Sequence, residues 1–253
     1  METVMTSERN SDAEKNFAIK KRVLFSHKSE KQKGKFSFDI ENVIEILRTK
    51  RKVFSSEADF QLALAWTIKD VYRDSVDVRM EYCPDFDLNM HIDIVVFVGD
   101  KWIPIELKYK TTHVHGGIKV NKEIFHLKTH SAKPQNCYKY LCDIERIEKV
   151  RAQKPDLFLE GYAIFLTNEL SYRDVSGKGC SYEQFAISEG CKRTGKMKWA
   201  ENTSDGTKRG CGENIDLKDE YTMQWKIFSG CKTVSGEEEK FIYLINSITN
   251  KSK

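Results

Sequence analysis

The sequence has no long hydrophobic run. Its longest apolar stretches, 94–98 and 241–245, are far shorter than the roughly 20 residues that a membrane-spanning helix needs. The first residues are polar and charged, and they lack the apolar stretch of a secretory signal. These absences exclude a membrane protein, and we expect the chain to act in the cytoplasm.

Cysteine pairs of the C-x-x-C type are also missing, although the chain has seven cysteines. Structural zinc sites bring two ligands within about two to four residues of each other. Four cysteines in a region rich in glycine and lysine are spaced much more widely: Cys180, Cys191, Cys211 and Cys231. We therefore expect reduced thiols and no structural zinc.

A large excess of charge of one sign is missing too. The 253 residues include 42 Lys and Arg against 38 Asp and Glu, a net charge of +4. Residues 107–154 are an exception, because they hold eleven basic and four acidic residues. Such a segment suits a polyanion such as nucleic acid, and an ordinary solvated lysine surface remains the alternative.

Three regions follow one another along the chain. Residues 1–35 are polar and predict a loosely ordered arm. Residues 36–168 contain the periodic apolar segments of a mixed α/β fold. Residues 169–253 predict a β-rich extension packed on the same core, with strand-like segments at 185–187, 221–228 and 241–248.

Within 36–168 the apolar spacing predicts two helices, then strands, a helix and a strand. Ser56 and Asp59 form a capping-box pattern at the start of the second helix. A turn at 99–101 separates two strands, and a polar connection follows them at 111–134. The expected elements are helices at 36–47, 56–72 and 135–153, and strands at 76–82, 90–98, 102–109 and 161–167.

Charged residues occur in this pair of strands where apolar ones are expected. Asp93 lies within a β-branched run, and strand alternation places Glu106 and Lys108 on one face of the next strand. Buried charges are costly unless they are paired or bind a cation. Two carboxylates beside an ammonium suit a Mg²⁺ ion that polarises a phosphoryl oxygen and activates water. A solvated strand face is the alternative for Glu106 and Lys108 alone.

The segments Ile92-Asp93-Ile94-Val95-Val96 and Ile105-Glu106-Leu107-Lys108 resemble the PD-(D/E)XK, or restriction-endonuclease-like, nuclease superfamily. Glu57 resembles the helical carboxylate of many members, and the resemblance covers roughly 55–168. It implies an α/β fold with an αβββαβ core, whose mixed central sheet is flanked by helices. Its implied metal ligands are Asp93, Glu106, the backbone carbonyl of Leu107, and Glu57; Lys108 is the implied catalytic lysine.

The sequence departs from the family pattern at two places. Ile92 stands where many members have proline. The following helix has Gln135 with Tyr138 three residues on and Lys139 four residues on, in place of Gln-x-x-x-Tyr. We expect Lys110, Gln135, Tyr138 and Lys139 to contact nucleic acid.

The expected function is that of a Mg²⁺-dependent deoxyribonuclease, with Mn²⁺ as a substitute, in bacterial or phage restriction, defence or repair. The extension is the expected specificity region. A ribonuclease using the same site, a catalytically silent nucleic-acid-binding module and a partner-activated subunit stay open, as does a homodimer. Trp199 and Trp225 in the extension either stack on bases or belong to the core.

Overall fold

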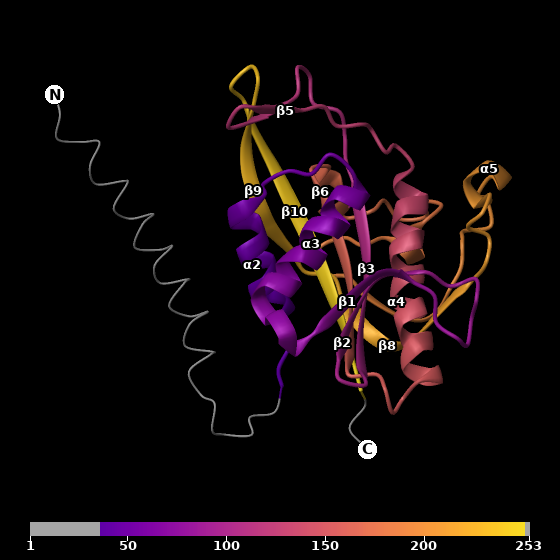
Figure 1. Cartoon of the computed structure of the whole chain (residues 1–253). Coiled ribbons are helices and arrows are strands. Elements are labelled where there is room, and N and C mark those ends of the chain that lie inside the picture. The colour runs from indigo at the N-terminus through magenta and orange to yellow at the C-terminus, as the bar shows by residue number, and fades with distance from the viewer. Residues whose placement is uncertain (1–35, 251–253) are drawn as a thin grey trace. The chain divides into compact units, whose positions relative to one another are not determined.

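The computed structural model describes residues 36–250 (Figure 1). Residues 42–250 belong to one compact unit, and residues 36–41 belong to another. The described helices are α2 (Ile40–Lys50), α3 (Glu57–Tyr72), α4 (Lys133–Gln153) and the short α5 (Asp205–Lys208). The strands are β1 (Asp77–Tyr82), β2 (Ile92–Val98), β3 (Lys101–Lys110), β4 (Ile118–Val120), β5 (Glu123–Phe125), β6 (Glu160–Thr167), β7 (Lys192–Met197), β8 (Ile215–Thr222), β9 (Trp225–Thr233) and β10 (Glu238–Thr249).

Eight strands form a mixed central sheet in the order β1-β2-β3-β6-β10-β9-β4-β5. β3 and β6 run parallel to each other, and the other neighbours run antiparallel. Helix α3 packs on β1, β2 and β3, whereas α4 covers the opposite face over β3 and β6 (Figure 1). The predicted mixed α/β fold, with a mixed central sheet flanked by helices, is confirmed at this level.

The start of α3 is fixed by its cap. The Ser56 hydroxyl accepts the N–H of Asp59 at 3.1 Å, and the Asp59 carboxylate accepts the N–H of Ser55 at 2.8 Å. Glu57 is therefore the first residue of the helix, as the capping pattern predicted.

Strands β2 and β3 form the predicted hairpin, closed by a turn in which Gly99 adopts a φ of +61°. Their paired residues run from Val98–Lys101 to Ile94–Ile105. No β2–β3 pair is recorded within residues 36–250 beyond Ile105, so the second half of β3 has no strand beside it on that edge. Asp93, Glu106 and Lys108 lie at this point, where the two strands separate.

The polar connection predicted at 111–134 is wrong in part. It contains the short hairpin β4–β5, whose first strand pairs with β9 at the far side of the sheet. Strands of three residues carry too little alternation to be distinguished from a loop. The predicted helix after it is confirmed as α4, with Pro134 in its first turn.

The extension also differs in detail from the prediction. Phe185 ends a 3₁₀ turn, Glu183–Phe185, and is not in a strand. The strand-like run at 221–228 is divided between β8, which pairs with β7 in a separate two-stranded sheet, and β9. β9 and β10 are strands of the central sheet itself, so this part of the extension completes the sheet.

Within residues 36–250, no helix has the length and apolar character needed to cross a membrane. The predicted arm, residues 1–35, lies outside the described part of the chain. All seven cysteines lie within residues 36–250, and each is a free thiol.

Candidate active site

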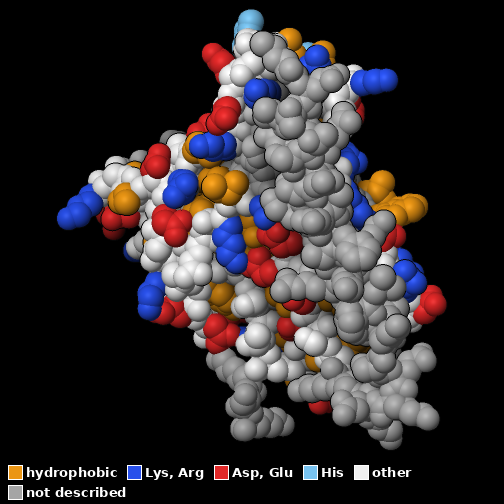
Figure 2. Space-filling view, turned by 90° about the vertical axis from the view of Figure 1, so that its left-hand side faces the viewer, with side chains coloured by type: hydrophobic (Ala, Val, Ile, Leu, Met, Phe, Trp, Pro, Cys, Tyr) orange, Lys and Arg blue, Asp and Glu red, His pale blue; other side chains and the backbone are white. Residues whose placement is uncertain are grey.

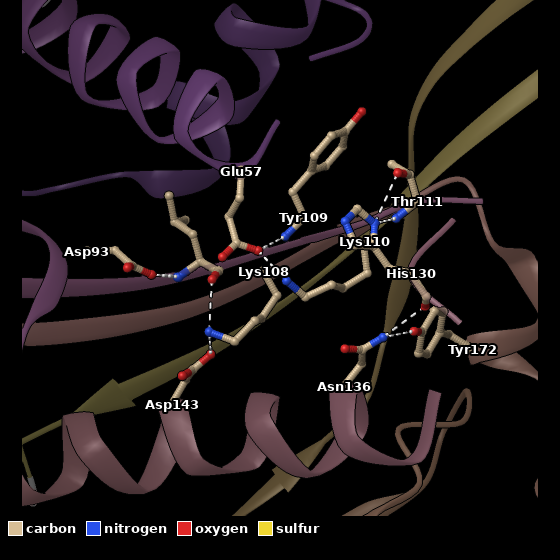
Figure 3. A network of polar contacts seen from close by, with 11 residues as sticks. Glu57, Asp93, Lys108, Tyr109, Lys110, Thr111, His130, Asn136, Asp143 and Tyr172 are labelled. Atoms are coloured by element: carbon tan, nitrogen blue, oxygen red, sulfur yellow. Dashed lines mark hydrogen bonds and ion pairs between the residues drawn. The ribbon is translucent and has the colours of Figure 1, made fainter. Parts of the chain in front are cut away.

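Two backbone N–H groups on the unpaired edge of β3, and a third just after its end, are bound by side chains from other elements (Figure 3). Asp93 on β2 accepts from Leu107 N at 2.6 Å, and Glu57 on α3 accepts from Tyr109 N at 2.7 Å. His130 Nδ1 accepts from Thr111 N at 3.0 Å. Because buried backbone donors need acceptors, these contacts draw Asp93 and Glu57 onto β3.

Glu106 and Lys108 project toward α4 and form ion pairs there. Lys108 Nζ lies 2.6 Å from Asp143 Oδ2 and donates to the Leu107 carbonyl at 3.1 Å. Arg146 lies 2.9 Å from Glu106 Oε2 and 3.5 Å from Asp143 Oδ1. One turn of α4 thus supplies a carboxylate for the lysine and a guanidinium for the glutamate.

Glu106 is the most unusual group at the site, because its side chain is fully buried. Its Oε1 atom accepts no hydrogen bond from any residue in the described chain. Burial, followed by the charges of Asp143 and Asp93, raises the pKa of Glu106 well above its usual range. This carboxylate therefore lacks a partner for one oxygen and holds a proton readily.

Asp93 and Lys108 respond differently to the same surroundings. Burial raises the pKa of Asp93 to about 6, although Lys108 and the Leu107 N–H oppose the shift. Burial also disfavours the charged form of Lys108, but the carboxylates of Asp143 and Asp93 outweigh it and raise the pKa of Lys108. Lys108 is thus a permanent cation, whereas Asp93 titrates near pH 6.

Glu57 and Asp93 have a second set of contacts with α3 and β3. Lys110 Nζ lies 2.7 Å from Glu57 Oε2. Gln61, one turn after Glu57, donates from Nε2 to the Asp93 carbonyl at 2.6 Å and to Glu81 at 2.7 Å. Gln61 therefore fixes the backbone of β2 at the residue that carries the acid.

We use the name β3 cluster for seven charged residues: Glu57, Asp93, Glu106, Lys108, Lys110, Asp143 and Arg146. Four are carboxylic acids and three are cations, so full ionisation leaves one negative charge in excess. A buried excess of this kind is relieved by a proton or by a bound cation.

No family model, curated protein or solved structure matches the chain.

The residues present fit a Mg²⁺ ion in their chemistry. The described residues contain no group of three His, Cys, Asp or Glu side chains that could hold a metal. Mg²⁺ does not need such a group, because it keeps several waters and uses one or two carboxylates. Asp93 on β2 and Glu106 on β3 lie just beyond the last β2–β3 pair, Ile94–Ile105, where the two strands separate. The Glu106 Oε1 atom lacks a donor.

Of the four residues predicted to contact nucleic acid, Tyr138 is set apart from the other three. Lys110 belongs to the β3 cluster, and helical spacing places Gln135 and Lys139 on the same face of α4 as Asp143. Tyr138 is 5% exposed, stacks on Trp199 and donates from its hydroxyl to the Glu213 carbonyl. Tyr138 thus packs α4 against the extension.

The two tryptophans left open by the sequence are also buried. The Trp225 indole N–H donates to the Ile187 carbonyl at 2.8 Å. Trp199 packs against both Tyr138 and Phe185. Both rings belong to the core and have no face open for stacking on bases.

Sequence reasoning missed Asp143, Arg146 and Gln61. Asp143 is the detectable one, because it occupies a position between the buried residues Tyr140 and Ile144 of α4. An acid on the buried side of an amphipathic helix needs a cation, and Lys108 was the available candidate. Arg146 and Gln61 look like ordinary solvated helix residues.

Proposed function

We propose that the chain has a restriction-endonuclease-like core and is a Mg²⁺-dependent deoxyribonuclease. Apart from the β4–β5 hairpin inserted between β3 and α4, the element order α3-β1-β2-β3-α4-β6 follows the αβββαβ pattern and supports the core assignment. The antiparallel β1-β2-β3 sheet and the parallel β3–β6 pair are consistent with it. The site lies where β2 and β3 separate.

The observation that carries the proposal is the unpartnered oxygen of Glu106 next to Asp93 and Lys108. Asp93, Glu106 and the Leu107 carbonyl would hold the ion, and Glu57 borders the site from α3. When bound, Mg²⁺ would polarise a phosphoryl oxygen and lower the pKa of its water.

The protein groups then have separate tasks. Lys108 stays charged and stabilises the negative charge that develops on the attacked phosphate. Asp143 positions the lysine, and the Leu107 carbonyl holds it from the other side. Arg146 neutralises Glu106 while no cation is bound.

The test is cleavage of plasmid and linear DNA, with RNA in parallel, in Mg²⁺, Mn²⁺ or EDTA. We expect Glu106→Gln and Lys108→Ala to reduce cleavage by roughly 100-fold or more, because the first removes a carboxylate that would hold the ion and the second removes the cation that would act on the reacting phosphate. Asp93→Asn is preferred to Asp93→Ala, because the amide oxygen still accepts the Leu107 N–H. Circular against linear substrate separates endonuclease from exonuclease action, and RNA cleavage alone would make the enzyme a ribonuclease.

Glu148→Gln is a matched control for Glu106→Gln. Glu148 lies on α4 and, like Glu106, is buried. It accepts from Lys218 N, Asp219 N and the Tyr221 hydroxyl, away from β3. We expect this variant to keep its activity at a temperature where it is folded. Equal cleavage by the parent and the Glu106 and Lys108 variants would overturn the proposal.

A catalytically silent nucleic-acid-binding module is the second candidate. It is favoured by the internal pairing of the site, in which Lys108, Lys110 and Arg146 each contact a carboxylate. Such pairs can be purely structural. This candidate predicts binding of nucleic acid without cleavage in any of the three buffers.

A further inference from the structure

A groove rich in lysine lies between the end of α2, the β4–β5 hairpin and strands β9 and β10. It consists of two adjoining hollows of about 610 and 420 Å³, which share Lys50, Lys52, Val120 and Asn121. We name it the basic groove. Its charged lining residues are Lys50, Arg51, Lys52, Lys119, Lys122, Lys232, Lys240, Glu123, Glu238 and Glu239.

The basic groove holds seven cations and three acids, a surplus of four. This equals the formal net charge of the entire chain, which is +4. Figure 2 shows cations and acids intermixed on the visible part of one face, so pairing decides where charge is left over. Only Lys50 and Arg51 among the groove cations have ion pairs recorded within residues 36–250, with Asp70 and Asp59.

The remaining five lysines line the same groove, and two of them repel each other across neighbouring strands. Lys119 on β4 is directly opposite Lys232 on β9. Like charges in this arrangement destabilise a sheet, and Glu238, across from Lys232 on β10, offsets only part of the repulsion. All five lysines are exposed, and a bound anion would remove this repulsion.

The base of the groove is not filled by other atoms, and a hydrogen bond joins two of the segments that form it. Gly230 on β9 lines it, and a Cβ atom added there would meet no atom within 4 Å. The Lys52 carbonyl accepts the hydroxyl of Ser229 at 2.6 Å, which ties the loop before α3 to β9. The groove therefore belongs to the sheet and is not formed by a loop alone.

We propose that the basic groove binds the phosphate backbone of a nucleic acid. Its cations are six lysines and one arginine from several segments, so they offer separate point charges instead of one converging pocket. This arrangement suits successive phosphates of a polymer, without reading base sequence. The proposal deepens the function proposed above, because Lys52 lies five residues before Glu57 and the groove would extend the substrate contact beyond the β3 cluster.

The test is binding of a labelled duplex and a labelled single strand in EDTA, where cleavage does not interfere. We expect the triple variant K119Q/K232Q/K240Q to weaken binding roughly ten-fold or more at ~0.1 M salt. The slope of log affinity against log salt should fall by roughly 2 to 3 for the duplex, about one for each lost phosphate contact.

The matched control is K178Q/K196Q/K198Q, which removes the same charge from lysines that do not line the groove. Equal weakening by both triples would show that total charge alone matters and would overturn the proposal. The groove variant should melt no lower than the parent, because it removes a like-charge pair. Unchanged DNA binding by a folded groove variant would also overturn it.

Tripolyphosphate serves as the small-anion probe. If the groove variant loses tripolyphosphate but keeps both oligonucleotides, the site takes a small anion and the polymer proposal fails. Binding lost in the groove variant while the parent cuts nothing would support the groove and refute the nuclease. A groove variant that still cleaves DNA and binds it with the parent's affinity would refute the groove proposal but not the nuclease proposal.

Discussion

Single side chains at the centre of the β3 cluster depend on one another because they are buried. Lys108 and Asp143 are 13% and 3% exposed at their side chains, so neither is well solvated. Removing one partner of such a pair leaves an uncompensated buried charge. The contribution of each residue is therefore visible only against its partner.

Lys108→Met should lower the free energy of unfolding by about 3–5 kcal/mol, because it leaves the buried Asp143 with only Arg146 as a partner, and Arg146 also pairs with Glu106. Adding Asp143→Asn should restore much of the loss, since the second change removes the stranded charge. Urea unfolding of the two variants and the parent measures both effects. Equal losses in the single and double variants would show that the pair is not coupled.

Asp93 should make stability depend on pH. Its pKa of about 6 in the folded state is above the ordinary value of 3.8, so the folded state binds more protons between these values. Its contribution is thus complete below about pH 4 and is lost as pH rises through 6. Urea unfolding in EDTA should show a smaller loss from pH 4 to 7 in Asp93→Asn. Parallel pH profiles for variant and parent would contradict this.

At the scale of elements, the exposed edge of β3 explains how the site is assembled. Side chains take the place of a neighbouring strand by accepting its N–H groups. The same contacts bring α3, β2 and the loop before α4 to one strand. Asp93 and Glu57 would therefore combine this structural role with the functional role proposed for them.

Glu57→Ala should destabilise the protein by about 1 kcal/mol and speed hydrogen exchange at the Tyr109 amide, which loses its acceptor. Glu57→Gln should retain most of the protection, because its amide oxygen can still accept. Exchange measured by NMR distinguishes these results. A Tyr109 amide that exchanges equally slowly in both variants would mean that Glu57 is not its acceptor.

The sequence predicts those elements whose pattern is local. The β-branched run around Asp93 and the capping pattern at Ser56 locate β2 and α3, and alternation puts Glu106 and Lys108 on one face. The partners Asp143 and Arg146 depend on how α4 lies over β3, which no spacing encodes. The basic groove is also hidden, because its lysines come from separate segments and several of the lysines in 107–154 are paired elsewhere, such as Lys149 with Asp87.

At the scale of the whole molecule, the central sheet joins the predicted core to the extension. β6 is paired along its length with β10, from Thr167–Ile242 to Glu160–Thr249. Apart from its first residue, β6 is buried throughout. The segment 36–168 therefore contains the β3 cluster but lacks the strand that covers one edge of its sheet.

We expect a fragment of residues 36–168 to be aggregation-prone or without fixed tertiary structure, because it exposes the apolar edge of β6. Full-length protein should show dispersed NMR resonances under the same conditions. A soluble fragment with similarly dispersed resonances would show that the core folds without β9 and β10.

The late partner of β6 has a kinetic consequence. During synthesis β6 is complete about 80 residues before its partner β10 exists, since Glu160 pairs with Thr249. Contacts of such long sequence separation slow folding and prolong the lifetime of partly folded chains. The nascent chain thus carries an open, apolar strand edge while these residues are translated, and we expect chaperones to bind it more readily in that interval than after β10 has paired.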